Sequence, residues 1–376
     1  MIPFNRSYVS SHELDYIKTA IESNALSGDG AYTNYCHDWL RQELGSGYPL
    51  LTQSATAALD MAALLANLNP GDEVIMPSYT FVSTANAFVL RGAIPVFIDI
   101  RADNLNMDEE LISGAISSRT RAIVPVHYAG VACEMDIILD IAQKKELLVI
   151  EDAAQGIMAT YKGRSLGAIG DMGAISFHAT KNISCGEGGA FLTNNSKIAE
   201  HAEIIREKGT NRSKFFRGEV DKYNWVSIGS SYLPSELNAA YLAAQFEVAK
   251  EITKERMTIW RRYHSAFMDA ESHGYIQRPV IPDECIHNAH IYYLIMHNLE
   301  SRTKFINLMK QKGISCTFHY VPLHSSPCGI NMGRVGSEMA FTDDLSNRIV
   351  RLPLWPGLGK HQDYIIECAL EAITIA

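Results

Sequence analysis

The feature that most constrains the fold is an alternation of strand-like and helix-like segments between about residues 50 and 195. The strand-like segments are short, apolar and rich in β-branched residues: DEVIMPS (72–78), IPVFIDI (94–100), RAIVPVHY (121–128) and LLVIEDA (147–153). Helix-like segments stand before and between them: SATAALDMAALLANL (54–68), STANAFVLRG (83–92) and MDIILDIAQKKE (135–146). Strands that are buried on both faces are continuous apolar runs, and their alternation with helices predicts a mostly parallel sheet between two layers of helices. We therefore expect an α/β protein.

The second half of the chain predicts a smaller unit. Residues 235–270 form a long amphipathic stretch, which we expect to be one helix that leads out of the first unit. Beyond it, strand-like and helix-like segments follow one another without the regular alternation. We therefore expect a large α/β domain over 1–250 and a smaller C-terminal α+β domain over 251–376, a division that suits a chain of 376 residues.

Chemistry is expected where the strands of the parallel sheet end. Ligands of open α/β sheets bind outside the carboxyl ends of the strands. The polar or unusual residues that follow the apolar runs are Pro77, Asp99, His127, Asp152 and Lys181. Because parallel strands end at the same edge of a sheet, these residues are candidates for one site.

Asp152 and Lys181 make the most specific pair among these residues. Lys181 ends the strand-like run AISFHAT, and Asp152 ends LLVIED. Taken alone, Asp152 is explained by helix capping and Lys181 by a solvent-exposed strand end. Their positions at successive strand ends favour a second interpretation, in which the carboxylate pairs with a cationic ligand and the amine does chemistry.

An anion site is expected beside this pair. Ser54 is a candidate N-cap, and the small residues that follow it leave the first amides of the helix uncovered, which suits a phosphate. Ser176 could add a hydroxyl, and Phe81 could stack on a flat ring. Each of these features also has a purely structural explanation, and for His127 and His178 a buried, hydrogen-bonded histidine is the commoner case.

One ligand satisfies all of these groups, namely a flat molecule with a basic ring nitrogen, a phosphate and an aldehyde that reacts with a lysine. Pyridoxal 5′-phosphate (PLP) has these parts. Several motifs, in the right order over essentially the whole chain, resemble the sugar-nucleotide aminotransferases of the fold type I PLP enzymes: PSYTF (77–81), PVHYAG (125–130), EDAAQG (151–156), SFHATKN (176–182), GEGG (186–189) and HYVPLH (319–324). The resemblance implies a PLP-dependent transaminase with the fold type I architecture.

The resemblance also implies roles for single residues. Lys181 carries the cofactor and acts as the general base, and Asp152 pairs with the ring nitrogen. Phe81 stacks on the ring, Gln155 lies against its substituents, and His178 is close to it. Ser176 and the amides of Ala55 and Thr56 hold the phosphate. Many relatives have an asparagine that reaches the partner subunit's phosphate, and Ser231 stands at that position here.

The expected second substrate is a nucleotide sugar. Residues 206–222 have six basic and three acidic residues and two phenylalanines, so this segment is either an exposed loop or a nucleotide-sugar contact. The candidate substrate contacts are Arg212, Lys214, Tyr223, Ser231 and His319. MIPFN, LSGDG (26–30) and EKGTNRSKFFRG (207–218) resemble the branch of the family that forms dTDP-4-amino-4,6-dideoxygalactose. That likeness implies glutamate as amino donor, C4 of a dTDP-4-keto-6-deoxyhexose as acceptor, and a homodimer that shares its active sites. A C3- or UDP-sugar substrate and the gluco epimer stay open.

Composition excludes several other classes of function. A net charge of −9 argues against a general affinity for nucleic acid or acidic membranes. The first residues lack a signal-peptide pattern, and the longest apolar helix candidate is too short to span a bilayer. The seven cysteines are scattered and show no metal-ligand spacing, which predicts reduced thiols in the cytoplasm and no metal site.

Three competing functions remain to be weighed. A sugar dehydratase of the same fold has histidine where Lys181 stands. A non-catalytic regulator that binds the cofactor would carry a DNA-binding motif, and none is visible. A nicotinamide-dependent oxidoreductase needs a glycine fingerprint that opens a helix, whereas GEGG runs into another apolar, strand-like segment.

Overall fold

The computed structural model describes residues 1–376 and is built on one eight-stranded sheet. The strand order is β1 (Leu50–Thr52), β9 (Gly189–Leu192), β8 (Met172–Ser176), β5 (Leu148–Asp152), β4 (Thr120–Ile123), β2 (Glu73–Pro77), β3 (Ile94–Ile98) and β13 (Arg334–Val335). Every neighbouring pair is parallel except the two pairs that β9 forms. The predicted α/β fold with a mostly parallel sheet is confirmed.

Helices cover both faces of this sheet. Successive residues of a strand point to opposite sides of the sheet, and here both sides carry apolar side chains that pack against helices. One hydrophobic cluster joins Val74, Ala122 and Ile150 to helices on one face, and another joins Ile75, Ile123 and Val149 to helices on the other. The first face carries α3 (Ala55–Leu65), α4 (Val82–Val89) and α7 (Ser196–Arg206). The second carries α2 (Ala31–Leu44), α6 (Met135–Lys145) and α9 (Glu236–Glu247), and α1 (Glu13–Glu22) packs on α9.

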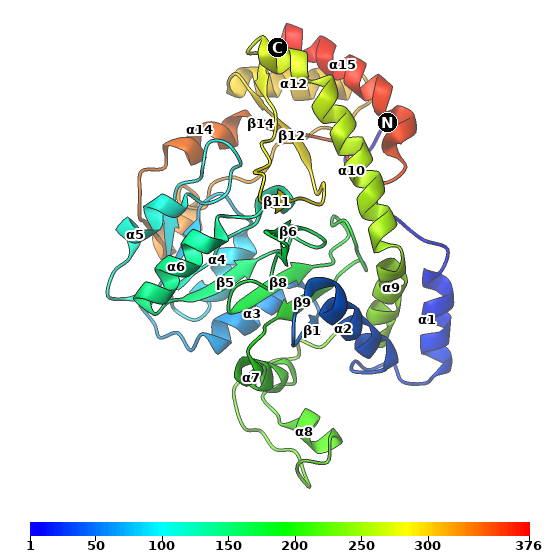
Figure 1. Ribbon diagram of the computed structural model, residues 1–376, viewed down its shortest axis with the longest axis vertical. Helices are drawn as coiled ribbons and strands as arrows, with labels where there is room; N and C mark the ends of the chain where they lie inside the picture. The colour runs from blue at the N-terminus through cyan, green and yellow to red at the C-terminus, as the bar shows by residue number, and fades with distance from the viewer.

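A second antiparallel sheet forms in the C-terminal part of the chain, in the order β10 (Ile276–Gln277), β12 (Tyr292–Met296) and β14 (Ile349–Leu352). The buried members of its hydrophobic cluster lie within residues 259–373, and Ile2 from the N-terminus packs against them. The helices around it are α10 (Ala249–Ala266), α11 (Met268–Ser272), α12 (Leu299–Gln311), α14 (Ala340–Arg348) and α15 (Gln362–Ile375). Figure 1 shows α12 and α15 at the end of the molecule opposite α8 (Arg212–Phe216).

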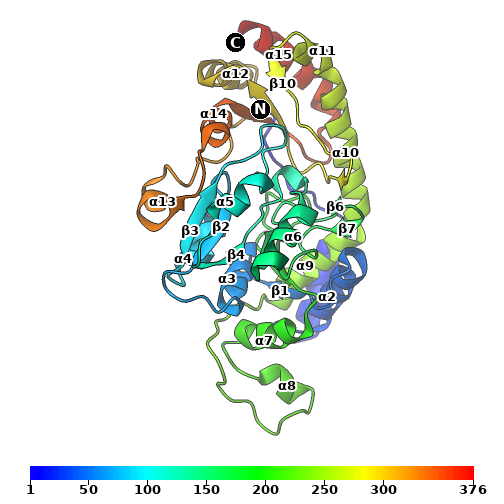
Figure 2. The same cartoon turned by 60° about the vertical axis from the view of Figure 1, so that its left-hand side comes forward.

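The two parts of the chain interleave. The C-terminal part returns β13 to the edge of the large sheet, and α13 (Pro327–Met332) lies beside β3 (Figure 2). The N-terminal Ile2 amide in turn donates to the Gly313 carbonyl at 2.7 Å. A small sheet of β6 (Thr160–Tyr161), β7 (Arg164–Ser165) and β11 (Cys285–Ile286) also joins the two parts. The boundary at residue 250 stays a prediction.

The expectation of one helix across residues 235–270 is wrong. The chain leaves helical geometry at Val248 (φ −108°, ψ 11°), between α9 and α10. The burial of the two helices gives the physical reason. Most of α9 is buried against the large sheet, whereas α10 buries one face and continues to the C-terminal sheet (Figure 1).

Residues 207–234 form an arm that extends beyond α7 (Figure 1). Its apolar side chains are unusually open to solvent, since Phe216 is 67% and Trp225 80% exposed. No helix in the chain combines the length and apolar character that a membrane span requires.

Candidate active site

A cavity of about 930 Å³ lies at the carboxyl ends of the central strands. That volume suits a cofactor together with part of a substrate. Its wall contains ten of the residues that the sequence singled out: Ser54, Ala55, Thr56, Phe81, Asp152, Gln155, Ser176, His178, Lys181 and His319. Residues 80–83, before and in the first turn of α4, and most residues of 317–323 and 351–354 in the C-terminal part line further parts of the wall.

Asp152 is a carboxylate held in a fixed position. It ends β5 and is only 6% exposed. Thr84 Oγ1 donates to its Oδ2 at 2.6 Å, and the Ala154 amide donates to its Oδ1 at 3.1 Å. Thr80 in turn hydrogen-bonds Thr84 at 2.7 Å. A buried carboxylate that is oriented in this way can pair with a cationic group in the cavity.

Lys181 lies in the turn that follows β8, where its amide donates to the His178 carbonyl at 2.8 Å. Burial lowers the pKa of its amine to about 8, Asp152 opposes this effect, and the positive charge of Arg351 adds to it. An amine with this pKa is partly neutral near pH 8 and can act as a nucleophile or a base.

The start of α3 offers an anion site. Ser54 caps the helix by accepting from the Ala57 amide at 3.1 Å, while the amides of Ala55 and Thr56 have no partner in the protein. Ser176 Oγ accepts from the His178 amide at 3.3 Å, which leaves its hydroxyl proton free. Two free amides at a helix N-terminus beside a hydroxyl suit a phosphate.

Gly189 allows this anion site to form. A Cβ atom built there would lie 2.4 Å from the Ala55 nitrogen and 2.3 Å from the Ser54 carbonyl carbon. Only glycine lets β9 approach the start of α3 so closely. This explains the last glycine of GEGG, which the sequence showed only as part of a turn.

Gln155 is held by its own hydrogen bonds. The Ala129 amide donates to Gln155 Oε1 at 2.7 Å, and Gln155 Nε2 donates to the Tyr320 hydroxyl at 2.8 Å. Tyr320 stacks on His319, with their ring centroids 3.7 Å apart. Burial lowers the pKa of His319 well below its usual value, and the charges of Arg351 and Lys181 add to this effect, so the ring stays neutral.

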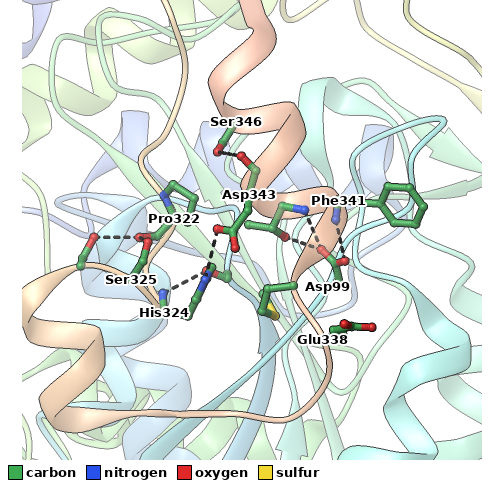
Figure 3. Close-up of polar contacts among 12 residues, drawn as sticks. Asp99, Pro322, His324, Ser325, Glu338, Phe341, Asp343 and Ser346 are labelled. Atoms are coloured by element: carbon green, nitrogen blue, oxygen red, sulfur yellow. Dashed lines mark hydrogen bonds and ion pairs between the residues drawn. The ribbon is translucent and has the colours of Figure 1, made fainter. Parts of the chain in front are cut away.

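The two other polar strand-end residues have structural roles. His127 Nε2 lies 2.8 Å from Glu151, and both side chains are buried. Asp99 accepts from the amides of Phe341 and Thr342 at the start of α14, at 2.9 and 2.7 Å (Figure 3). Neither residue lines the cavity, so of these strand-end candidates Asp152 and Lys181 belong to the site and Asp99 and His127 do not.

The polar cluster in Figure 3 fixes the segment that carries Tyr320. His324 Nδ1 lies 2.7 Å from Ser78 Oγ, and its Nε2 lies 3.3 Å from Asp343. Ser78 is fully buried at the end of β2. The cluster therefore ties HYVPLH to the large sheet and positions one wall of the cavity.

The four predicted substrate contacts in the arm do not line the cavity of their own chain. Arg212 pairs with Glu207 at 3.3 Å, Lys214 pairs with Glu200, and Ser231 forms a backbone bridge with Glu207. Tyr223 packs on Phe215, with ring centroids 5.9 Å apart. Acidic residues of the same chain thus engage Arg212 and Lys214, and contact with a nucleotide sugar stays a prediction.

Four further residues at the site were not singled out from the sequence: Thr84, His290, Tyr320 and Arg351. Tyr320 stands in a quoted motif, so the sequence carried a signal for it. The other three reach the site through tertiary packing, and their local sequence gives no signal.

The residues around the cavity fit PLP. Asp152 suits its ring nitrogen, Lys181 its aldehyde, and the free amides of Ala55 and Thr56 its phosphate. Phe81 is 56% exposed and lines the wall, so its face is available to a flat ring.

Comparison with known proteins agrees with this chemistry. The DegT/DnrJ/EryC1/StrS aminotransferase family matches residues 8–369. The spore coat polysaccharide biosynthesis protein SpsC of Bacillus subtilis is 31% identical over 381 residues, which cover 99% of this chain and 97% of that protein. An uncharacterised protein of Methanocaldococcus jannaschii is 34% identical over 363 residues, which cover 94% of this chain and 93% of that protein.

Solved structures show the same fold over nearly the whole chain. A DegT/DnrJ/EryC1/StrS aminotransferase from Brucella abortus has a TM-score of 0.88 at 28% identity, covering 96% of this chain and 95% of that one. Spr1654 of Streptococcus pneumoniae, in its PLP form, has a TM-score of 0.91 at 25% identity, covering 100% and 99%. These neighbours confirm the fold type I architecture. The chain therefore belongs to the DegT/DnrJ/EryC1/StrS family and is a PLP-dependent sugar aminotransferase.

Proposed function

We propose that the enzyme transfers the amino group of glutamate to C4 of dTDP-4-keto-6-deoxy-D-glucose and forms dTDP-4-amino-4,6-dideoxy-D-galactose. The proposal rests on LSGDG, EKGTNRSKFFRG and GSSYL (229–233), which look like the transaminase of that reaction. The observation that carries it is that the first motif, distant in sequence from the other two, meets them at the base of the arm.

The contacts among the three motifs are close. Arg206 precedes the second motif, and its Nη2 donates to Asp29 of the first at 2.5 Å. The Lys208 amide donates to the Ser230 carbonyl of the third at 3.0 Å. A Cβ on Gly28 would lie 2.2 Å from the carbonyl oxygen of Pro234, which follows the third motif, and 2.6 Å from the Leu233 side chain, so the first motif packs closely against the end of the third. A unit built from motifs typical of one branch supports the substrate of that branch.

Residues of this chain give the cofactor its binding site. Ala55, Thr56 and Ser176 hold the phosphate, Asp152 pairs with the ring nitrogen, and Phe81 covers the ring. Gln155 and His178 lie beside it in the same wall. When bound, PLP supplies an electron sink that accepts the electron pair released as the proton moves.

Lys181 moves that proton. Its amine, with a pKa of about 8, takes the proton from the donor's α-carbon and delivers it to the neighbouring position of the reacting system. With the keto-sugar the same amine works in the opposite direction. Burial holds the pKa of the adjacent His290 well below its usual value, and the charge of Lys181 adds to this effect, so His290 stays a neutral neighbour.

A second copy of the chain completes the proposed site. The arm extends beyond α7 (Figure 1), contributes no residue to the wall of its own cavity and exposes Phe216, Trp225 and Ile228, which suits a contact with a partner. In this proposal Arg212, Lys214, Tyr223 and Ser231 approach the partner's cavity, whereas His319 contacts substrate in its own. Light scattering at assay concentrations should find a dimer, and a fully active monomer would contradict the shared site.

We place the reaction in the cytoplasm, since all seven cysteines are free. The test of the function is to incubate the enzyme, PLP and glutamate with the dTDP-4-keto-sugar and to read the coupling of H4 to H3 and H5 by proton NMR. Small couplings identify an axial amine and the galacto product. Large couplings would indicate the gluco epimer. Turnover of only a 3-keto or UDP sugar would reject the substrate.

A further inference from the structure

A second pocket, of about 560 Å³, lies outside the catalytic cavity and shares no residue with its wall. It opens between α10 and the segment that runs from the end of β10 to just beyond β11, with one residue from α11. Its lining combines charged residues, imidazoles and an apolar wall: Arg261, His264, Glu271, Arg278 and His287, with Met257, Trp260, Pro279, Val280, Ile281, Cys285 and Ile286.

The charges of this pocket leave one cation without a partner. Glu271 is the only acidic residue of the lining, and Arg278 engages it, with Nε donating to Glu271 Oε2 at 2.8 Å. Arg261 forms no ion pair, although its neighbour Arg262 pairs with Asp363. The pocket therefore has one unpaired positive charge, which favours an anionic ligand.

His287 adds a hydrogen-bond donor to the pocket, although the residue is only 7% exposed. Its Nδ1 accepts from the Ala289 amide at 3.3 Å, which places the ring proton on Nε2. Burial lowers the pKa of His287 to about 4, and the charge of Arg261 adds to this effect, so the ring is neutral. Nε2 has no partner in the protein and is not among the enclosed atoms, so its N–H is open to the pocket.

His264 supplies a second donor. Its ring stacks on Trp260 with centroids 4.6 Å apart, and His287 meets the same indole at 4.4 Å. Burial lowers the pKa of His264, and the charge of Arg278 adds to this effect. Nδ1 of His264 is enclosed without a hydrogen-bond partner, so the neutral ring carries its proton on Nε2. Two imidazole N–H groups and a free guanidinium thus line one pocket.

We propose that this pocket is a second ligand site, for a small molecule that joins a phosphate group to an apolar body, and that its ligand is an effector of the transaminase. A phosphate has enough oxygens for all three donors, on Arg261, His264 and His287, whereas a carboxylate has two. The pocket is larger than a phosphate, and Val280 and Ile286, which are 47% and 65% exposed, offer apolar surface to the remainder. The inference is independent of which sugar is aminated.

The segment of residues 287–290 leads from this pocket to the catalytic cavity. His287 holds the Ala289 amide, and Ala289 has a left-handed backbone (φ 52°), which costs energy in a residue with a Cβ atom. A phosphate that accepts from Nε2 polarises the imidazole and makes Nδ1 a stronger acceptor for this amide. A ligand in the pocket therefore strengthens the hold on Ala289.

The same segment anchors the turn that carries Lys181. The next residue, Asn182, donates from Nδ2 to the Asn288 carbonyl at 2.8 Å, and its Oδ1 lies 2.9 Å from His290 Nδ1. His290 itself lines the catalytic cavity. A change in the hold on residues 287–290 is thus transmitted to the position of Lys181, and with it to the rate of proton transfer.

The experiment measures the binding of phenyl phosphate, benzoate and inorganic phosphate by calorimetry. The enzyme is loaded with PLP, so that the cofactor's own phosphate site is filled. The pocket variants are Arg261→Gln and His264→Phe, the second of which keeps an aromatic ring on Trp260 and breaks no hydrogen bond of the imidazole. Arg262→Gln is the matched control, because Arg262 is the next residue of α10 and does not line the pocket. Thermal melting checks that each variant is folded.

Phenyl phosphate should bind more tightly than benzoate or inorganic phosphate. Arg261→Gln and His264→Phe should each weaken its binding by about tenfold or more, and Arg262→Gln should match wild type. Phenyl phosphate should also change the rate of the donor half-reaction, followed by the absorbance of the PLP enzyme with glutamate, by about fivefold or more. Arg261→Gln should lose this effect at concentrations that saturate the wild type.

Three results would overturn the inference. Binding of phenyl phosphate that is unchanged in both pocket variants would place the ligand elsewhere, the catalytic cavity included. Equal affinity for benzoate would overturn the assignment of a phosphate group. An unchanged donor half-reaction in the wild type with the pocket saturated would overturn the effector role. The donor half-reaction needs no sugar, so a failure of the proposed sugar substrate would leave these results unaffected.

Discussion

Replacing Asp152 by asparagine should separate the role of its charge from its role in the fold. The carboxylate is 6% exposed and accepts from Thr84 and from the Ala154 amide. In Asp152→Asn, the amide oxygen can still accept from Ala154. The amide nitrogen can donate to Thr84, whose hydroxyl can turn and donate to Thr80, because the Thr80–Thr84 hydrogen bond works in either direction. Every buried group then keeps a partner, and we expect the free energy of unfolding of the apo protein to change by less than about 1 kcal/mol.

Catalysis should respond very differently to the same change. Loss of one partner from a buried, hydrogen-bonded charge pair costs about 2–5 kcal/mol, which corresponds to a factor of roughly 30 to several thousand in turnover. Asp152→Ala is the matched control, because it leaves the Ala154 amide without its acceptor and should lower stability as well, by about 1–3 kcal/mol.

Urea unfolding of the apo proteins and steady-state turnover with excess PLP measure the two effects separately. Activity of Asp152→Asn within about tenfold of wild type would refute the charge pairing. It would leave Asp152 as a structural residue only.

Three further predictions concern the remaining parts of the site. Gly189→Ala should force β9 away from Ser54 and Ala55, lower stability by about 1–3 kcal/mol and weaken PLP binding. The control is Gly114→Ala, whose added Cβ meets no atom within 4 Å and should change neither stability nor PLP binding. Equal PLP affinity in the two variants would argue against the anion site. Burial lowers the pKa of Lys181 to about 8, so its neutral amine becomes more abundant as the pH rises. The rate of the donor half-reaction should therefore increase up to about pH 8 and then level off. Stopped-flow rates that fall over this range would contradict the role of Lys181 as a base. Lys181→Ala should fold and melt like wild type but show no turnover, and wild-type-like activity in this variant would remove Lys181 from the mechanism.

The sequence predicted those parts of the site that depend on local structure. Lys181 and Asp152 stand at the ends of apolar strands, and Ser54 shows the pattern of a helix N-cap, so their positions follow from short segments. The parallel order of the strands then brings them to one edge of the sheet.

The rest of the site depends on contacts between distant segments. Arg351 reaches the cavity from β14, and His290 reaches it from the segment before β12. No local pattern distinguishes Arg351 from a surface arginine. The same holds for Asp99 and His127, whose buried partners Thr342 and Glu151 decide that they are structural.

The helix boundary at Val248 was missed for a related reason. The 235–270 stretch contains neither proline nor glycine, and only its packing against two different sheets explains why the chain leaves helical geometry between α9 and α10.

The most direct test of the central claim is to locate the covalently attached cofactor. The PLP enzyme is reduced with borohydride and digested with trypsin, and its peptides are analysed by mass spectrometry. The account predicts that the reduced cofactor appears on the peptide of residues 165–197, with cleavage blocked at Lys181, and that Lys181→Ala shows no labelled peptide. A label on any other lysine, or an unlabelled wild-type enzyme that still turns over, would contradict the account.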